Sequence, residues 1–405
     1  MSAARLLCRT TAIFTSPPVA SRLVAHWTPR APALAAAPPR RHCTAPTSTT
    51  MTMATPSSPK RMRPTPRIVT HSGSFHADEV LACHMLRVLP EYKNAEILRS
   101  RDAAVWATAS VLVDVGAEYV PAQHKYDHHQ REFQDTFSPA HKIRLSSAGL
   151  IYKHFGKRVI ATLLDCAETD PRVALVHSKL YDDLIEAFDA IDNGVSRYPI
   201  DVKPAYRDAT SLSSVVAKLN PFWNEPASDA DVLARFEEAM TIVGAHFDRC
   251  ARYLGLAWAP ARTMVEDALA QVSLRTATTK LAVHAHILVM EQYCPWKDHL
   301  NSLEPAASHE VTAPIKEGAP VPANVLLYVV FPDTSGSWRV QAIAVRPDSF
   351  ESRKPLPSKW RGLRDAALDA VTGVPGGVFI HASGFIGGHK TREGAIKLAE
   401  MAVGM

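Results

Sequence analysis

Short apolar runs and amphipathic helical patterns follow one another between residues 67 and 155. The runs at 67–70, 95–99 and 111–115 are apolar without alternation, which is typical of strands buried on both faces of a parallel sheet. One amphipathic helix is expected to begin near Asp78, and another to cover 147–155. This order predicts an α/β fold with a mostly parallel sheet flanked by helices.

A second, smaller α/β unit is expected toward the C-terminus. Helical patterns at 181–191 and 230–254 precede predicted strands at 283–290, 325–331 and 338–345, a helix at 363–370, a strand at 377–381 and a helix at 392–403. A Pro-, Ala- and Gly-rich stretch at 304–322 is typical of a long loop. We therefore expect a disordered leader at 1–64, a larger domain at 65–260, a connecting helix, strand and linker at 261–322, and a C-terminal domain at 323–405.

Charge separates the leader from the rest of the chain. The net charge is +5, but the residues before the first acid, Asp78, carry +10, which leaves −5 for the remainder. The overall charge of the folded part therefore gives no argument for nucleic-acid binding. No apolar run reaches the roughly 18 residues of a membrane-spanning helix, so no membrane partner is expected.

The leader is rich in Arg, Ser, Thr, Ala and Pro and contains no acid, a composition typical of a mitochondrial transit peptide. The basic cluster 60–63 resembles a small nuclear signal. We expect the protein in the mitochondrial matrix and the nucleus. The alternative is a Pro-rich tail that carries no address.

Four clusters of acids and histidines carry the candidate chemistry. They are His71–Glu79 with His76 and Asp78, the single acid Asp114, Asp127-His128-His129, and Asp189-Ala190-Ile191-Asp192. Each cluster follows a predicted strand or lies in a turn, where ligand sites of open α/β sheets form. Carboxylate and imidazole ligands suit Mn²⁺, Mg²⁺, Zn²⁺ or Fe²⁺. The six cysteines are scattered without a CxxC pair, which argues against a zinc ribbon or a disulfide framework.

Taken singly, each cluster has an ordinary structural explanation. Asp78 could be a helix N-cap, Asp127–His129 a solvated loop, and Asp192-Asn193-Gly194 a turn. The occurrence of four such clusters at successive strand or loop boundaries favours a shared site.

These clusters closely resemble those of the MYG (melanocyte proliferating gene) family, within the DHH phosphoesterase superfamily. The resembling stretches are 70–79, Tyr126–Gln130, Cys294–Lys297, Phe350–Pro357, Trp360–Leu363 and His381–Gly388. The resemblance runs from about residue 66 to the C-terminus and leaves only the leader outside. It implies a DHH-type catalytic domain, a C-terminal substrate-binding domain and an active site in the cleft between them.

The resemblance also implies a site with two divalent ions, Mn²⁺ or Mg²⁺. One ion would be held by His71, His76 and Asp114, and the other by Asp78, Asp114, His128 and Asp192. His129 would contact the scissile phosphate, and Asp127 would orient a neighbouring imidazole. The middle position of the first motif, normally an acid, is His76, and the spacing from His71 is one residue longer. This departure leaves His71, His76 or both as ligands and favours a softer ion.

A glycine-rich segment near the C-terminus is the candidate phosphate site. Gly387, Gly388, His389 and Lys390 precede a predicted helix, whose N-terminus would favour an anion. Arg353, Lys354 and Arg361 are further candidates to line the cleft or to lie in a surface loop, and Trp360 is either a base-stacking side chain or a core anchor. A plain strand–helix turn explains the glycines equally well.

The resemblance implies a 3′→5′ exonuclease that acts on single-stranded RNA. The site chemistry alone supports hydrolysis of a phosphoester or phosphoanhydride. Two alternatives stay open: a hydrolase of a small substrate, such as pyrophosphate or a short oligonucleotide, and a non-catalytic regulator that binds nucleotide or RNA. The sequence allows a homodimer but does not decide the oligomeric state.

Overall fold

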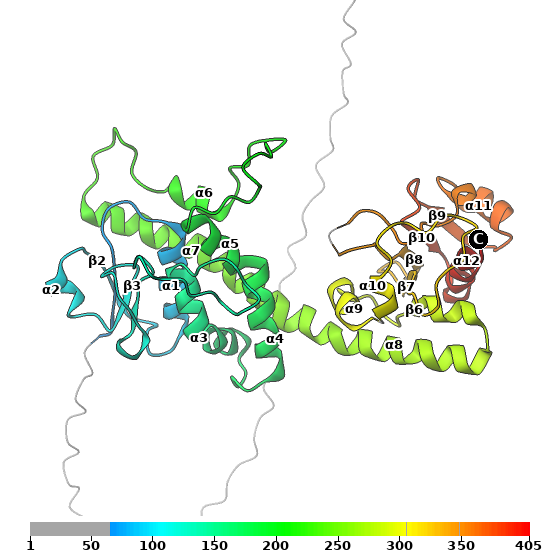
Figure 1. Cartoon of the computed structure of the whole chain (residues 1–405), viewed down its shortest axis with the longest axis horizontal. Helices are drawn as coiled ribbons and strands as arrows, with labels where there is room; N and C mark the ends of the chain where they lie inside the picture. Colours follow the sequence, from blue (N-terminus) through cyan, green and yellow to red (C-terminus); the bar gives the residue numbers. More distant parts are fainter. Residues whose placement is uncertain (1–64, 305, 348) are drawn as a thin grey trace, which may run out of the picture. The chain divides into compact units, whose positions relative to one another are not determined.

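The computed structural model describes residues 65–304, 306–347 and 349–405. The expectations for the leader at 1–64 therefore lie outside the described residues. Within them, the chain has two five-stranded sheets with helices against them, which confirms the expected mixed α/β fold (Figure 1). Among the described helices, none is long and apolar enough to cross a membrane.

The N-terminal sheet has the strand order β2-β1-β3-β5-β4. Its strands are β1 (Arg67–Thr70), β2 (Glu96–Arg99), β3 (Val111–Val113), β4 (Tyr119–Val120) and β5 (Lys125–Tyr126). The pairs β2–β1, β1–β3 and β3–β5 are parallel, and the β5–β4 pair is antiparallel. The carboxyl ends of β1, β3 and β5 therefore meet at one edge of the sheet.

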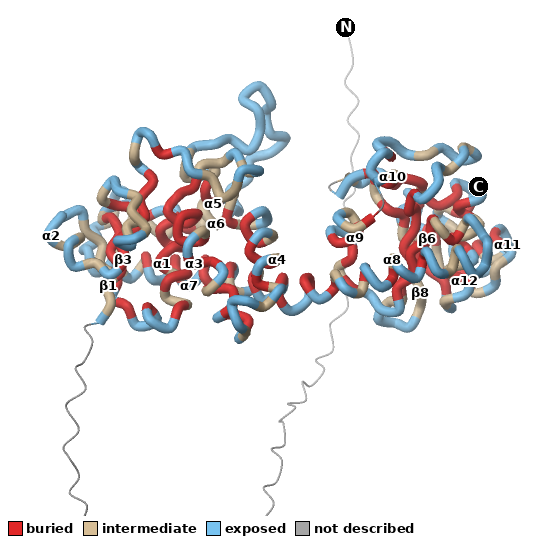
Figure 2. Tube along the Cα trace, turned by 60° about the horizontal axis from the view of Figure 1, so that its bottom comes forward, coloured by how far each residue is buried: buried red, intermediate tan, exposed pale blue. Residues whose placement is uncertain are grey.

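Seven α-helices accompany the N-terminal sheet. They are α1 (Ala77–Val88), α2 (Ala103–Trp106), α3 (Ser147–Leu164), α4 (Pro171–Leu180), α5 (Glu186–Asp192), α6 (Leu212–Ala217) and α7 (Asp229–Tyr253). The apolar faces of α1 and α3 pack on each other and on the sheet, and they supply much of the buried core (Figure 2). A π-helical turn, Tyr181–Ile185, separates α4 from α5, which carries two of the candidate acids. Such turns are frequent near functional sites.

The C-terminal sheet has the order β6-β7-β8-β10-β9 and is antiparallel except for the β6–β7 pair. Its elements are α8 (Ala259–Thr279), β6 (Ile287–Val289), α9 (Lys297–Leu303), α10 (Ala306–His309), β7 (Tyr328–Pro332), β8 (Trp338–Ala342), α11 (Asp365–Thr372), β9 (Gly377–Ile380), β10 (Ile386–His389) and α12 (Arg392–Gly404). One face packs against α12 and the other against α8 and α9.

Candidate metal centre

Four of the candidate side chains come from the shared carboxyl edge of β1, β3 and β5. His71 directly follows β1, Asp114 directly follows β3, and His128 and His129 follow β5. Because these three strands are neighbours and run parallel, their next residues are held side by side. Residues that are far apart in the sequence but directly follow these strands therefore lie close together in space.

Asp114 lies at the centre of this cluster. Its carboxylate is 3.4 Å from His71 Nε2 and 3.5 Å from His128 Nε2, and it accepts a 3.0 Å hydrogen bond from Ser147 Oγ. Burial opposes the charge of Asp114, but the two imidazoles prevail and hold its pKa well below the usual range. The backbone of Asp114 has φ +56°, a conformation that Asp tolerates better than most residues and that is enriched at functional sites.

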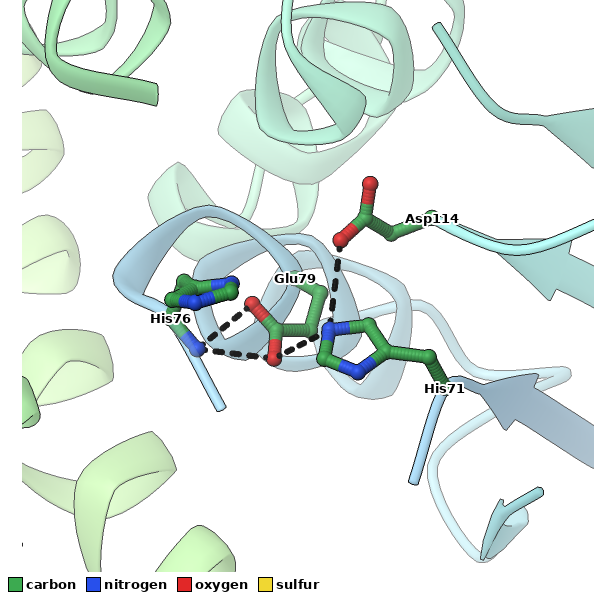
Figure 3. Close-up of side chains that lie close together, drawn as sticks. All are labelled: His71, His76, Glu79 and Asp114. Carbon is green, nitrogen blue, oxygen red and sulfur yellow. Dashed lines mark hydrogen bonds and ion pairs between the residues drawn. The ribbon is translucent and has the colours of Figure 1, made fainter. Parts of the chain in front are cut away.

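His71, Glu79 and His76 form one side of the centre (Figure 3). His71 Nε2 lies 3.1 Å from Glu79 Oε1, while the backbone N–H of His76 donates to both Glu79 oxygens at 2.9 and 3.0 Å. His76 is the N-cap of α1, so Glu79 completes a capping box. Burial opposes protonation of His71, but Asp114 and Glu79 raise its pKa to about 10.

Asp78 gives the clearest support for cation binding by this set of residues. Its side chain is buried, and neither carboxylate oxygen has a hydrogen-bond partner among the described residues. Burial, followed by repulsion from Asp114 and Glu79, raises the pKa of Asp78 well above its usual value. A buried carboxylate without a partner is costly unless a metal ion or a proton neutralises it.

His128 and Asp192 form the opposite side. His128 Nε2 is 3.0 Å from Asp192 Oδ2, yet this atom makes no hydrogen bond of acceptable geometry to any described residue. Burial opposes protonation of His128, but the nearby carboxylates of Asp114 and Asp192 raise its pKa to about 9. The arrangement is that of two ligands facing a common position rather than of a bonded pair.

Three groups of side chains have donor atoms within 4.8 Å of one another. They are His71 with His76, Glu79 and Asp114; Asp114 with His128 and His129; and His76 with Asp78 and Asp192. Asp114 belongs to two groups and so does His76. The donors are imidazole nitrogens and carboxylate oxygens, with no thiolate, and this set fits a divalent metal such as Mn²⁺, Mg²⁺, Fe²⁺ or Zn²⁺.

His129 differs from the buried His71 and His128 because its side chain is 60% exposed. Its Nδ1 lies 2.6 Å from Asp127 Oδ1, and the other Asp127 oxygen accepts a hydrogen bond from the backbone of Ala117. The hydrogen bond that His129 donates to the Asp127 carboxylate raises the pKa of His129. Asp127 therefore orients His129 and leaves the rest of this imidazole ring open to solvent.

Asp189, the other acid of the sequence cluster that contains Asp192, is not a member of the metal-ligand groups. It is completely buried, where it accepts hydrogen bonds from Ser146 N at 2.9 Å, Ser146 Oγ at 2.8 Å and Tyr181 Oη at 2.7 Å. A Cβ atom at Gly149 would lie 2.3 Å from this carboxylate, so glycine is needed there. Asp189 ties α5 to the start of α3, and Asp192 is the last residue of α5.

Asp189 should make stability depend on pH. Burial raises the pKa of Asp189 to about 7, despite hydrogen bonds from Ser146 and Tyr181 that favour the carboxylate. Because an unfolded Asp titrates near 3.8, the folded chain holds this proton more tightly. The Asp189 contribution to the free energy of unfolding is therefore full below about pH 4 and falls as pH rises to 7.

The free energy of unfolding of wild type and Asp189→Asn can be measured by urea unfolding in EDTA at pH 5 and at pH 7.5. We expect this free energy to fall less between the two pH values in Asp189→Asn than in the wild type. Asp165→Asn, at an exposed carboxylate, is the control and should follow the wild type. An unchanged pH dependence in Asp189→Asn would contradict an elevated Asp189 pKa.

A cavity of about 750 Å³ opens onto the centre, and residues of the metal-ligand groups line it. Two of the residues at the site were not among the predicted ligands. Glu79 could have been found from the spacing of the capping box, since it lies three residues after the N-cap His76. Arg101, an exposed cation in the cavity wall, follows the end of β2 at the same sheet edge.

The C-terminal residues predicted to bind substrate have mainly structural contacts. Lys354 is buried, and its Nζ donates to Val403 O at the end of α12. His389 is also buried and is bonded to Pro375 O and Thr391 N. Trp360 is a fully buried core side chain rather than a stacking surface.

The glycines are not a phosphate-binding loop in this structure. Gly387 and Gly388 lie within β10, between β8 and β9, where the backbone is committed to strand pairing. A Cβ at Gly387 would lie 2.3 Å from Ile380, so close packing explains this glycine. Arg361 is half-buried and donates to Leu356 O, whereas Lys390 is exposed.

Comparison with known proteins gives one consistent answer. The family model MYG1_exonuc, described as "Uncharacterised protein family (UPF0160)", matches residues 67–403. A "MYG1 protein" of Dictyostelium discoideum is 47% identical over 334 residues, which cover 82% of this chain and 94% of the relative. A "MYG1 exonuclease" of Homo sapiens is 46% identical over 348 residues, 84% of this chain and 86% of the relative.

A "MYG1 protein" of Saccharomyces cerevisiae is 41% identical over 342 residues, covering 83% of this chain and 95% of the relative. The matched region contains both sheets and every residue of the metal-ligand groups. These similarities confirm the family that the sequence motifs indicated, and the chain belongs to the MYG1 family.

Proposed function

We propose that this protein is a metal-dependent exonuclease that removes nucleotides from single-stranded RNA in the 3′→5′ direction. The observation that carries the proposal is the cluster of carboxylates and imidazoles around Asp114, whose possible metal-ligating atoms lie close together. Within it, the Asp78 carboxylate has no hydrogen-bond partner among the described residues. Relatives in Homo sapiens and Mus musculus are named MYG1 exonuclease, which supports the same reaction class.

Two ions, Mn²⁺ or Mg²⁺, would use most of the available donors. His71, His76 and Asp114 would hold one, and Asp78, Asp114, His128 and Asp192 would hold the other, with Asp114 shared. Such ions, when bound, lower the pKa of a water nucleophile and neutralise charge on the phosphate in the transition state. Glu79 would keep His71 and the start of α1 in place.

His129 and Arg101 would act on the substrate directly. The exposed His129 has a raised pKa through Asp127, so its protonated ring can donate a hydrogen bond to a phosphate oxygen. Arg101 lines the same cavity and supplies a second positive charge. Both groups would stabilise the negative charge that develops on the reacting phosphate.

The proposed sites of action are the mitochondrial matrix and the nucleus, where an RNA exonuclease would meet single-stranded substrates. This part of the proposal rests on the Arg-rich, acid-free leader and its basic cluster at 60–63. Residues 1–64 placed before a fluorescent protein should carry that protein into mitochondria. A fusion that contains the chain from residue 65 onward, without the leader, should not enter mitochondria.

Hydrolysis of end-labelled single-stranded RNA with Mn²⁺ tests the reaction. The wild type should shorten a 5′-labelled strand stepwise from its 3′ end, and His128→Ala should lose this activity because it removes a central ligand. His246→Ala, an exposed histidine on α7, is the matched control and should remain active. Equal activity in wild type and His128→Ala would show that the site is wrong.

Inactivity of the metal-loaded wild type on RNA would reject the exonuclease proposal. Release of phosphate from pyrophosphate or cleavage of a dinucleotide by that protein would then favour a hydrolase of small substrates. RNA binding without any hydrolysis would favour a non-catalytic regulator.

A further inference from the structure

A second cavity, of about 510 Å³, lies in the C-terminal part of the chain. Residues of α9, of the end of β8 and the segment after it, and of the loop before β10 line it. It contains none of the metal-ligand residues, and the residues predicted above to bind phosphate do not line it. Its volume suits a ligand of nucleotide size.

Three stretches on which the family resemblance rests meet at this cavity. Trp296 and Lys297 belong to the stretch Cys294–Lys297, Arg353 belongs to Phe350–Pro357, and Phe385 belongs to His381–Gly388. These stretches are far apart along the chain, and the metal centre uses none of them. Their meeting at one cavity therefore needs its own explanation.

The cavity wall contains a buried charge with an unused donor. Arg353 is 2% exposed and makes a bidentate ion pair with Glu304, at 2.6 and 2.7 Å. The pair neutralises both charges, yet Arg353 Nε has no hydrogen-bond partner among the described residues. A buried N–H without an acceptor is costly, but this nitrogen is shielded from solvent, so Arg353 and Glu304 form a rigid part of the wall rather than a ligand contact.

Aromatic side chains stand at the rim of the cavity. Phe350 is fully exposed, at 103% of its reference area, and Phe385 is 38% exposed, whereas Trp296 is buried beneath them in the wall. Exposed aromatic rings beside a cavity are typical of surfaces that stack on bases. Lys297 and Arg346 are exposed at the same cavity and give it positive charge.

We propose that this cavity binds one nucleotide unit of a single-stranded RNA, with the base stacked on Phe350 and Phe385 and a phosphate near Lys297. The inference deepens the proposed exonuclease function, on which its choice of RNA rests. It assigns substrate binding to different C-terminal residues from the glycine-rich segment.

Binding of fluorescently labelled pentaadenylate to the full chain in EDTA, measured by anisotropy, tests the site without hydrolysis. Phe350→Ala and Phe385→Ala should each weaken binding by about 5- to 100-fold, the usual effect of removing one stacking ring. Lys297→Ala should weaken binding and reduce the salt dependence by about one phosphate contact. Phe222→Ala, an exposed phenylalanine in the N-terminal part, is the matched control and should bind as the wild type.

Unchanged affinity in both cavity variants, relative to Phe222→Ala, would overturn the inference, and circular dichroism would show that the variants are folded. Hydrolysis with Mn²⁺ is measured separately on the same proteins. If the wild type degrades RNA while the cavity variants bind and degrade it equally well, the cavity inference fails and the exonuclease proposal stands. If the wild type does not degrade RNA but pentaadenylate binding is weakened in Phe350→Ala and Phe385→Ala, the cavity is a nucleotide site and the exonuclease proposal fails.

Discussion

Replacement of Asp114 by asparagine should nearly abolish metal-dependent hydrolysis. Asp114 is the acid shared by two ligand groups, and its carboxylate lies within 3.6 Å of three imidazoles. Asparagine keeps the size of the side chain and tolerates the positive φ, so the fold should survive. Loss of an outer partner of a metal site costs roughly 10–100-fold. For a shared ligand we expect about 10³-fold or more, because both of the proposed ions would lose a donor.

The control for Asp114→Asn is the same substitution at Asp165. Asp165 also has a positive φ, of 52°, but it is exposed at the end of α3. Metal content, measured by mass spectrometry after equilibration with Mn²⁺, should fall in Asp114→Asn and stay unchanged in Asp165→Asn. Full activity with normal metal content in Asp114→Asn would remove Asp114 from the centre.

The N-terminal sheet and the clustering of the candidate ligands were largely predictable from the sequence for one physical reason. Continuous apolar runs mark strands buried in a parallel sheet, and their ends must lie near one another at the same sheet edge. The predicted strand at 67–70 has the bounds of β1, and Asp114 directly follows β3. Polar residues that follow such strands therefore become neighbours.

Other features of the centre depend on contacts that no local pattern encodes. Asp189 and Asp192 are one helical turn apart on α5, and sequence spacing alone does not separate their roles. The distinction comes from Ser146 and Tyr181, which bond to Asp189 from other helices. Glu79 likewise carries a capping role and a contact to His71, and only the second is a tertiary contact.

The C-terminal part shows how glycine and lysine can mislead. The segment at 386–389 was expected to be a turn but forms β10, because Gly387 and Gly388 allow close packing between neighbouring strands. Lys354 was a candidate to line the substrate cleft, but its side chain is buried and its ammonium group donates a hydrogen bond to a helix-end carbonyl. In both cases the residue type fits two environments, and the packing decides between them.

Breaking the ion pair between Arg353 and Glu304 should be the largest single loss of stability among the changes considered. Both side chains are nearly inaccessible, at 3% and 1%, and are joined by two hydrogen bonds. Glu304→Ala would leave a buried guanidinium without its counter-ion, and removal of one partner of such a pair typically costs about 3–5 kcal/mol. Chemical denaturation of the full chain, followed by tryptophan fluorescence, should show this loss in the transition that reports on the C-terminal sheet.

Two further variants separate the cost of an isolated charge from the value of the pair. Glu304→Leu combined with Arg353→Met replaces both charges by apolar groups and should recover much of the stability, because the uncompensated charge is gone. Glu291→Ala breaks the exposed ion pair with Arg392 and should change the free energy of unfolding by less than about 1 kcal/mol. If Glu304→Ala were no more destabilising than Glu291→Ala, Arg353 would have to reach solvent or another acid, and its proposed position in the wall of the nucleotide cavity would be wrong.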